Sequence, residues 1–248
     1  MLWINVAISL STFVIIEIIR KSPIYRIFGL SSPVTPGEAI SDKRKFVIFL
    51  FIKWLYIFVP LIIIVILPSF TIGDLYILGF YKFHKGNLIA IILMTILVVG
   101  FSILLYPGIK SIKGLFKSFF AAWIIAGLPE DILIIGFLGG ALFKAFLSIL
   151  PPFAAMILSY LLIEFIFSAS HLPNVKRDEK LYATHMNGKD TIKPTRVILQ
   201  MTIFSLPSWI LFFISGNVFY SSFWHAAADM AAFFPDQNSE KNDNDINK

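Results

Sequence analysis

Eight long apolar segments constrain the fold of this chain more than any other feature of its sequence. They cover residues 2–19, 46–67, 88–106, 115–128, 130–149, 152–169, 196–214 and 217–234. Most of them approach the ~20 residues that a helix needs to cross the hydrocarbon core of a bilayer. They show no alternating pattern that would indicate a barrel, and backbone polar groups in lipid need partners within the protein. The sequence therefore predicts an all-α fold, a polytopic transmembrane helical bundle of seven to eight membrane helices.

The composition indicates the same class of protein. Hydrophobic residues make up 57% of the 248 residues and charged residues 15%, whereas soluble proteins have about 45–50% and about 25%. The chain has no cysteine, which excludes disulfides and thiolate chemistry. The net charge of +6 is concentrated in short connections between apolar segments, a pattern of membrane topology instead of nucleic-acid binding. We expect a multi-pass protein of a bacterial cell membrane, surrounded by lipid and without a nucleic-acid partner.

The basic connections also predict which side of the membrane each segment faces. Most of the 21 Lys and Arg residues lie in three connections, residues 20–45, 107–117 and 170–196. Such connections are cytoplasmic as a rule, which places the N-terminus outside. If residues 115–128 and 130–149 both crossed, the third connection would lie outside. We therefore favour residues 115–128 as an interfacial or re-entrant helix, with Pro129 beginning the next helix and seven crossings in total; eight crossings remain the alternative.

Glu130 and Asp131 stand side by side in a long apolar stretch, directly after Pro129. A charged side chain at membrane depth is costly, so each one is a candidate functional residue. The N-terminus of a helix also stabilises negative charge. The pair could therefore either cap a helix at the water interface or serve a reaction, and the two residues alone do not decide between these interpretations.

Two histidines occupy helix positions that could meet these carboxylates. His171 ends the apolar segment 152–169, and His225 lies in the last segment, four residues before Asp229. Residues four apart share one face of a helix. The charge topology places both histidines, Asp229 and the two carboxylates in the cytoplasmic half of the bundle.

A carboxylate near two imidazoles is suited to hydrolysis. The carboxylate can hold and deprotonate a water molecule, and the imidazoles can donate to the oxyanion that develops. The same three groups, Glu130, His171 and His225, could instead bind a divalent metal such as zinc and leave one position open for water. The residue types do not separate the two mechanisms.

Three short motifs carry a resemblance to a known family. They are Glu130-Asp131-Ile-Leu-Ile-Ile135, Phe167-Ser-Ala-Ser-His171 and His225-Ala-Ala-Ala-Asp229. In order, spacing and apolar surroundings they resemble Glu-Glu-x-x-x-Arg, Phe-x-x-x-His and His-x-x-x-Asn or Asp, which mark the CAAX-processing and bacteriocin-immunity (CPBP) family of intramembrane proteases. The resemblance covers roughly residues 115–234.

The resemblance implies a function for each of these groups. Glu130 would activate water, His171 and His225 would complete the site as oxyanion donors, Asp229 would take the Asn position and Asp131 the place of the second Glu. The implied activity is that of a CAAX prenyl protease-like endopeptidase that cleaves a peptide or protein, including a lipidated one, near the cytoplasmic membrane face. The mechanism it favours uses the glutamate without a metal.

The resemblance also suggests how the chain is divided. N-terminal transmembrane helices and basic loops occupy residues 1–114, and the catalytic helical core occupies residues 115–234. A polar tail at residues 235–248 has the composition of a disordered segment. Within the core, small residues on or near one helix face predict close helix packing. They are Gly136, Gly139 and Gly140.

The first motif departs from the family pattern at two positions. Asp131 replaces the second Glu, and Ile135 replaces the Arg that lies at ion-pair spacing from it. A buried charge without a partner is strongly destabilising, so we expect Arg196 or Lys193 to provide one. The alternative function is a non-catalytic relative that acts as a bacteriocin-immunity protein or binds a membrane partner. A proton-coupled transporter is disfavoured, because the sequence shows no inverted repeat.

Overall fold

The computed structural model of the protein describes the chain except for residues 22–23, 31–41, 72–84, 106–111, 178–193 and 231–248. The described residues form helices and no strand, so the predicted all-α bundle is confirmed. Within this described part, seven further helical segments accompany one long central helix. They are α1 (Leu2–Lys21), α2 (Ile24–Ile27), α4 (Lys43–Ile66), α6 (Lys85–Leu105), α10 (Pro152–Arg177), α12 (Pro194–Ser215) and α13 (Val218–Asp229).

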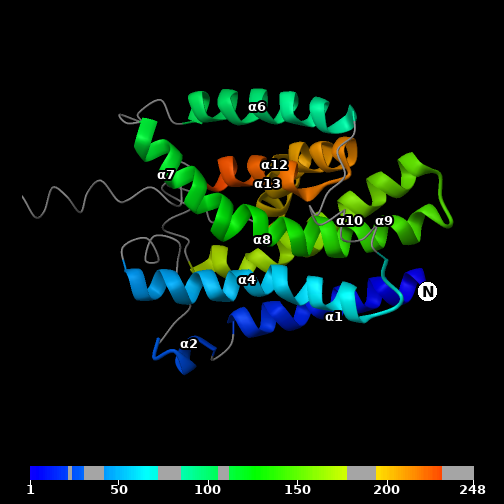
Figure 1. Ribbon diagram of the computed structural model, residues 1–248, viewed down its shortest axis with the longest axis horizontal. Helices are drawn as coiled ribbons and strands as arrows, with labels where there is room; N and C mark the ends of the chain where they lie inside the picture. The colour runs from blue at the N-terminus through cyan, green and yellow to red at the C-terminus, as the bar shows by residue number, and fades with distance from the viewer. Residues whose placement is uncertain (22–23, 31–41, 72–84, 106–111, 178–193, 231–248) are drawn as a thin grey trace, which may run out of the picture.

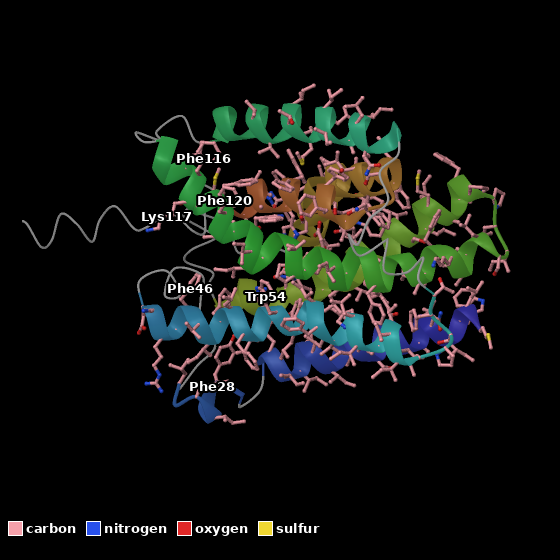
Figure 2. The ribbon with its side chains drawn as sticks, in the orientation of Figure 1. Phe28, Phe46, Trp54, Phe116, Lys117 and Phe120 are labelled. Carbon is pink, nitrogen blue, oxygen red and sulfur yellow. The ribbon has the colours of Figure 1, made fainter. Side chains whose placement is uncertain are left out.

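Several of these helices are long and apolar enough to cross a membrane. Within the described part of the chain the candidate spans are Leu2–Arg20, Lys43–Ile66, Leu115–Leu147, Pro152–Leu172 and Pro194–Ser215, and a shorter apolar helix covers Asn87–Gly100. Large apolar side chains project outward along them, as Figure 2 shows for Phe116 and Phe120, which are 57% and 49% exposed. An outer surface of this kind is expected of a polytopic protein in contact with lipid.

The central helix differs from the prediction. It runs without a break from Ile112 to Leu147, through α7 (Ile112–Ala122), α8 (Leu128–Asp131) and α9 (Gly140–Leu147). Two π-helical segments connect these parts, η1 (Trp123–Gly127) and η2 (Ile132–Gly139). The expectation of a separate interfacial or re-entrant helix at residues 115–128 is therefore wrong.

The reason lies in the backbone around Pro129, which we expected to begin a new helix. Proline has no N–H to donate to the preceding turn. The helix continues because Leu128 N–H donates to the carbonyl of Trp123, five residues back, as in a π turn. As one crossing, this helix still leads from its basic end, at Lys113 and Lys117, to the opposite side of the bundle. The number of crossings between residues 117 and 170 is therefore even, as the distribution of basic residues requires, and no re-entrant helix is needed.

The central helix is the core of the bundle. All eight residues of η2 are buried. Figure 1 shows α1 and α4 along one side of this helix and α13, α12 and α6 along the other. Helix α10 also packs against η2. The first helices of the chain therefore contact the same central helix as the last ones.

Two glycines allow the helices to approach closely. A Cβ atom at Gly127 would lie 2.5 Å from the carbonyl oxygen of Ser222 and 3.1 Å from the backbone nitrogen of Ala226, so α13 rests directly on the central helix. At Gly139 a Cβ would lie 2.7 Å from Cη2 of Trp209 in α12, which confirms the close packing predicted for this position. The first contact brings α13 next to α8, where the two adjacent carboxylates lie.

Candidate active site

Glu130 and Asp131 are buried in the middle of the central helix, in the short α-helical part between the two π segments. Their exposed fractions are 6% and 3%. Neighbouring residues on a helix point in different directions, and here Glu130 faces α4 while Asp131 faces α13. The interpretation that both residues only cap a helix end is therefore wrong.

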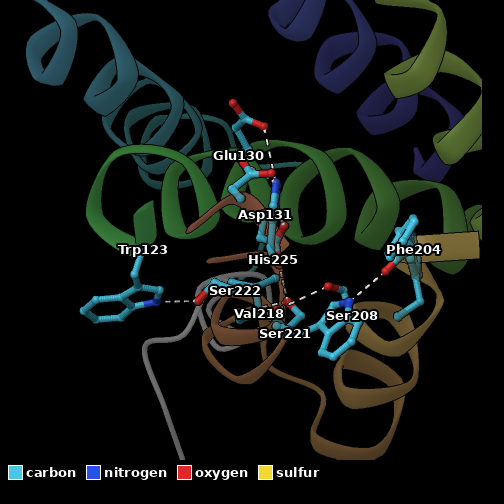
Figure 3. A network of polar contacts seen from close by, with 12 residues as sticks. Trp123, Glu130, Asp131, Phe204, Ser208, Val218, Ser221, Ser222 and His225 are labelled. Atoms are coloured by element: carbon cyan, nitrogen blue, oxygen red, sulfur yellow. Dashed lines mark hydrogen bonds and ion pairs between the residues drawn. The ribbon is translucent and has the colours of Figure 1, made fainter. Parts of the chain in front are cut away.

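Asp131 has two partners on α13. The Nδ1 atom of His225 lies 2.7 Å from its Oδ1 and donates to it, and the Ser221 hydroxyl donates to its Oδ2 at 2.7 Å (Figure 3). The expectation that Arg196 pairs with Asp131 is wrong, because Arg196 is exposed at the start of α12. Lys193 lies outside the described residues. The nearby imidazole and hydroxyl satisfy the carboxylate, since Gly127 lets α13 come close.

His225 lies at the centre of the site. Its Nε2 atom is 3.7 Å from Oε2 of Glu130 and 3.4 Å from Oδ2 of Asp229. The prediction that His225 and Asp229 share a helix face is confirmed by this contact. The side chain of Asp229 is 41% exposed, so this side of the site is open, whereas Glu130 and Asp131 are enclosed.

His171 lies near this cluster at the end of α10. Its Nδ1 donates to the carbonyl of Phe167 at 3.0 Å, and its ring packs on the Phe167 ring with the centroids 4.4 Å apart. The Phe167 ring also lies next to the His225 ring, and the centroids of these two rings are 6.3 Å apart. His171 and Glu130 are close enough to interact electrostatically. The structure thus brings Glu130, Asp131, His225 and Asp229 into contact and places His171 beside them.

The sequence argument missed a residue that contacts Glu130 directly. Lys53, on α4, forms an ion pair with Oε1 of Glu130 and is 5% exposed. Behind it, Glu17 of α1 accepts a hydrogen bond from Tyr56 at 2.6 Å. The sequence does contain a signal for both residues. A charged side chain within an apolar segment is a candidate functional residue, and this applies to a lysine in residues 46–67 and a glutamate in residues 2–19 as it does to Glu130.

The described residues were compared with the ligand set that a catalytic metal ion requires. Among the residues whose placement is described, no three His, Asp or Glu side chains are grouped as ligands of one ion. The Lys53 ammonium is bound to Glu130, where its charge would repel a second cation.

Comparison with protein families relates the segment that contains the site to a known class of protein. The family model described as Type II CAAX prenyl endopeptidase Rce1-like matches residues 112–231. This segment belongs to the Rce1-like family of CAAX-type membrane proteases, and the predicted resemblance to the CPBP family is confirmed. Comparison with curated proteins and with solved structures gave no match. Helices α1, α4 and α6 precede the matched segment.

Proposed function

We propose that this protein is an intramembrane endopeptidase that hydrolyses a peptide bond with water activated by Glu130. One observation carries the proposal. Oε2 of Glu130 and Nε2 of His225 face each other across 3.7 Å, while Asp131 holds the opposite nitrogen of the same ring. A separation above hydrogen-bond length between two polar atoms suits a bridging water molecule.

The proposed reaction proceeds in two steps. In the first, Glu130 takes a proton from the water molecule while the oxygen of that water attacks the carbonyl carbon of the peptide bond. In the second, the protonated Glu130 returns that proton to the leaving nitrogen as the C–N bond breaks. The products are a carboxyl group and an amine, so atoms and charge balance without a further reactant.

The two histidines have different roles in this proposal. His225 donates from Nε2 to the developing oxyanion, and the nearby carboxylates of Asp131 and Asp229 stabilise the positive charge on its ring. His171 gives its Nδ1–H to the carbonyl of Phe167, which leaves Nε2 as an acceptor. We therefore assign His171 to holding the attacking water, in place of the oxyanion role that the family resemblance implies.

The proposed substrate is a peptide or protein segment that reaches the site from the membrane. The matched family is one of CAAX prenyl endopeptidases, so peptides with a lipidated cysteine near the carboxyl terminus are the first substrates to test. The mechanism requires no metal ion. Each of its proton transfers uses a side chain of this chain.

The test is cleavage of a prenylated peptide library by the full-length protein in proteoliposomes. We expect Glu130→Gln and His225→Ala to lower kcat by on the order of 10²–10⁴-fold, and a chelator to leave the wild-type rate unchanged. Equal rates for the wild type and Glu130→Gln would exclude the glutamate mechanism. Loss of activity with the chelator, restored by zinc, would establish the metal mechanism instead. Binding of peptides without cleavage by the wild type would support the non-catalytic alternative.

A further inference from the structure

Lys53 is the only lysine or arginine within the described residues that forms an ion pair with Glu130. It lies in the interior of α4, 5% exposed, in a helix whose other residues near it are apolar or aromatic. A charged ammonium is among the most costly groups to bury in a membrane protein, and such residues are usually functional. The partner that offsets this cost is Oε1 of Glu130, the residue assigned as the base.

Three groups fix the position of the Lys53 ammonium. Besides Glu130, the rings of Phe49 and Tyr56 lie with their centroids 5.7 and 5.3 Å from its Nζ atom. A cation within about 6 Å of an aromatic ring is attracted by it. The ammonium is therefore held between two rings and one carboxylate oxygen.

Helix α1 fixes one of those rings. The Tyr56 hydroxyl donates to Oε1 of Glu17 at 2.6 Å, and Oε2 of Glu17 accepts from Nη2 of Arg20 at 2.7 Å. Tyr56 is 2% and Glu17 8% exposed. A continuous series of contacts therefore extends from α1 through α4 to the central helix and ends at Glu130.

The family pattern indicates which of the two carboxylates needs a cation from outside the motif. The family places an Arg four residues after the second acidic residue, and here that position is Ile135, which is apolar and 3% exposed. Asp131 is satisfied by His225 and Ser221. Glu130 is then the carboxylate of the pair that requires a cation, and the cation comes from α4, which lies outside the matched segment.

We propose that Lys53 is a positioning residue for peptide-bond hydrolysis, supported by the contacts of α1. By binding Oε1 of Glu130 it directs Oε2 toward Nε2 of His225 and the attacking water. Glu130 can take up and return the proton at Oε2 while Lys53 stays on Oε1. Without Lys53 the carboxylate would turn toward the imidazole and close the space for water. This inference rests on the proposed function.

The experiment compares Lys53→Met, which keeps the length of the side chain and removes its charge, with Lys53→Arg, which keeps the charge. The matched control is Lys117→Met, since Lys117 is an exposed lysine on α7 (Figure 2). All are assayed on the prenylated peptide in proteoliposomes. We expect Lys53→Met to lower kcat roughly 100-fold with KM little changed. The kcat of Lys53→Arg should be at least about tenfold higher than that of Lys53→Met. The kcat and KM of Lys117→Met should match those of the wild type.

A second variant tests the contacts behind Lys53. Tyr56→Phe keeps the ring beside the ammonium but loses the hydrogen bond to Glu17. We expect it to lower kcat several-fold and to leave KM unchanged. If Lys53→Met does not fold, Tyr56→Phe still decides the proposal, because it keeps the buried charge and removes only the hydrogen bond to Glu17. A wild-type kcat in Tyr56→Phe would then overturn it.

The possible outcomes separate this inference from the proposed function. If Glu130→Gln is inactive while Lys53→Met has the wild-type kcat, only the role of Lys53 is wrong. If Lys53→Met raises KM and leaves kcat unchanged, Lys53 binds substrate and the positioning role is also wrong. If Glu130→Gln is as active as the wild type, both proposals fail.

Discussion

At the scale of single residues, the two adjacent carboxylates have different partners because they face different helices. Glu130 meets the Lys53 ammonium of α4, and Asp131 meets His225 and Ser221 of α13. A carboxylate that accepts from Nδ1 of a histidine fixes the tautomer and orientation of the ring, as in serine protease triads. The replacement of the family Arg by Ile135 therefore does not leave Asp131 without a partner.

The exchange Asp131→Asn tests this orienting role. The amide keeps the shape of the side chain but has no negative charge, so the positive charge and the orientation of the His225 ring lose their support. We expect kcat to fall roughly 10²–10³-fold, with little change in KM. Kinetics on the prenylated peptide provide the measurement.

Asp229→Asn serves as the comparison for this exchange. Asp229 lies 3.4 Å from Nε2 of His225 and its side chain is 41% exposed, so water screens its charge. We expect a smaller loss, less than about tenfold. If Asp131→Asn were the milder of the two variants, Asp131 would not orient His225.

Local contacts at the site could be predicted from the sequence, and distant ones could not. The pair His225 and Asp229 follows from helix spacing alone. The contact of Lys53 with Glu130 joins residues 77 apart in the chain, and that of His225 with Asp131 joins residues 94 apart. Such pairs depend on which helices become neighbours, and charge spacing within one segment does not contain that information.

At the scale of elements, the two π segments are the distinctive feature of the central helix. They flank Glu130 and Asp131 on both sides. π turns are rare and often occur at functional sites, and shifts of this kind let a membrane helix pass a proline without losing its hydrogen bonds. The sequence rule that proline marks a helix start therefore failed at Pro129. The rule describes isolated helix ends, and here the neighbouring turns adapt.

Gly127→Ala tests whether the close contact of α13 with the central helix builds the site. The new Cβ would lie 2.5 Å from a backbone oxygen of Ser222, which cannot move without the helix. We expect a loss of about 1–3 kcal/mol in stability and a lower kcat, because His225 moves away from Asp131. Thermal unfolding in detergent and the peptide assay measure the two effects.

The matched control for this variant is Gly100→Ala on α6, where a Cβ would meet nothing within 4 Å. It makes the same chemical change in another apolar helix and should leave stability and activity close to the wild type. Equal behaviour of the two variants would show that α13 does not need this contact.

At the scale of the whole molecule, the site belongs to the complete bundle and not to the family segment alone. Helices α1 and α4 lie against the central helix on the side opposite α13 (Figure 1). They supply the ammonium group that pairs with Glu130, together with the residues that hold it. The apolar segments predicted the number and type of helices well, because lipid leaves the backbone few alternatives. The side-by-side order of the helices did not follow from them.

The orientation of the bundle in the membrane is the last prediction. Lys113 and Lys117 lie at the beginning of the central helix, whereas the connection at residues 148–151, at its other end, has no charged residue. The positive-inside rule then places the α7 end in the cytoplasm. Glu130 lies 13 residues beyond Lys117 and 18 residues before Ser148, about 20 Å and about 27 Å along a helix. We therefore expect the site inside the membrane, slightly nearer to the α7 end.

The absence of cysteine from the chain makes this orientation directly measurable. Lys117 and Ser148 are both exposed, at opposite ends of the central helix, so Lys117→Cys and Ser148→Cys each provide one thiol for a membrane-impermeant maleimide. In right-side-out vesicles we expect labelling of Ser148→Cys only, and in inside-out vesicles labelling of Lys117→Cys only. The reverse result would invert the bundle and place the open side of the site, at Asp229, nearer to the outer face. Substrates would then have to be sought among exported peptides, because a prenylated protein is made and anchored on the cytoplasmic side.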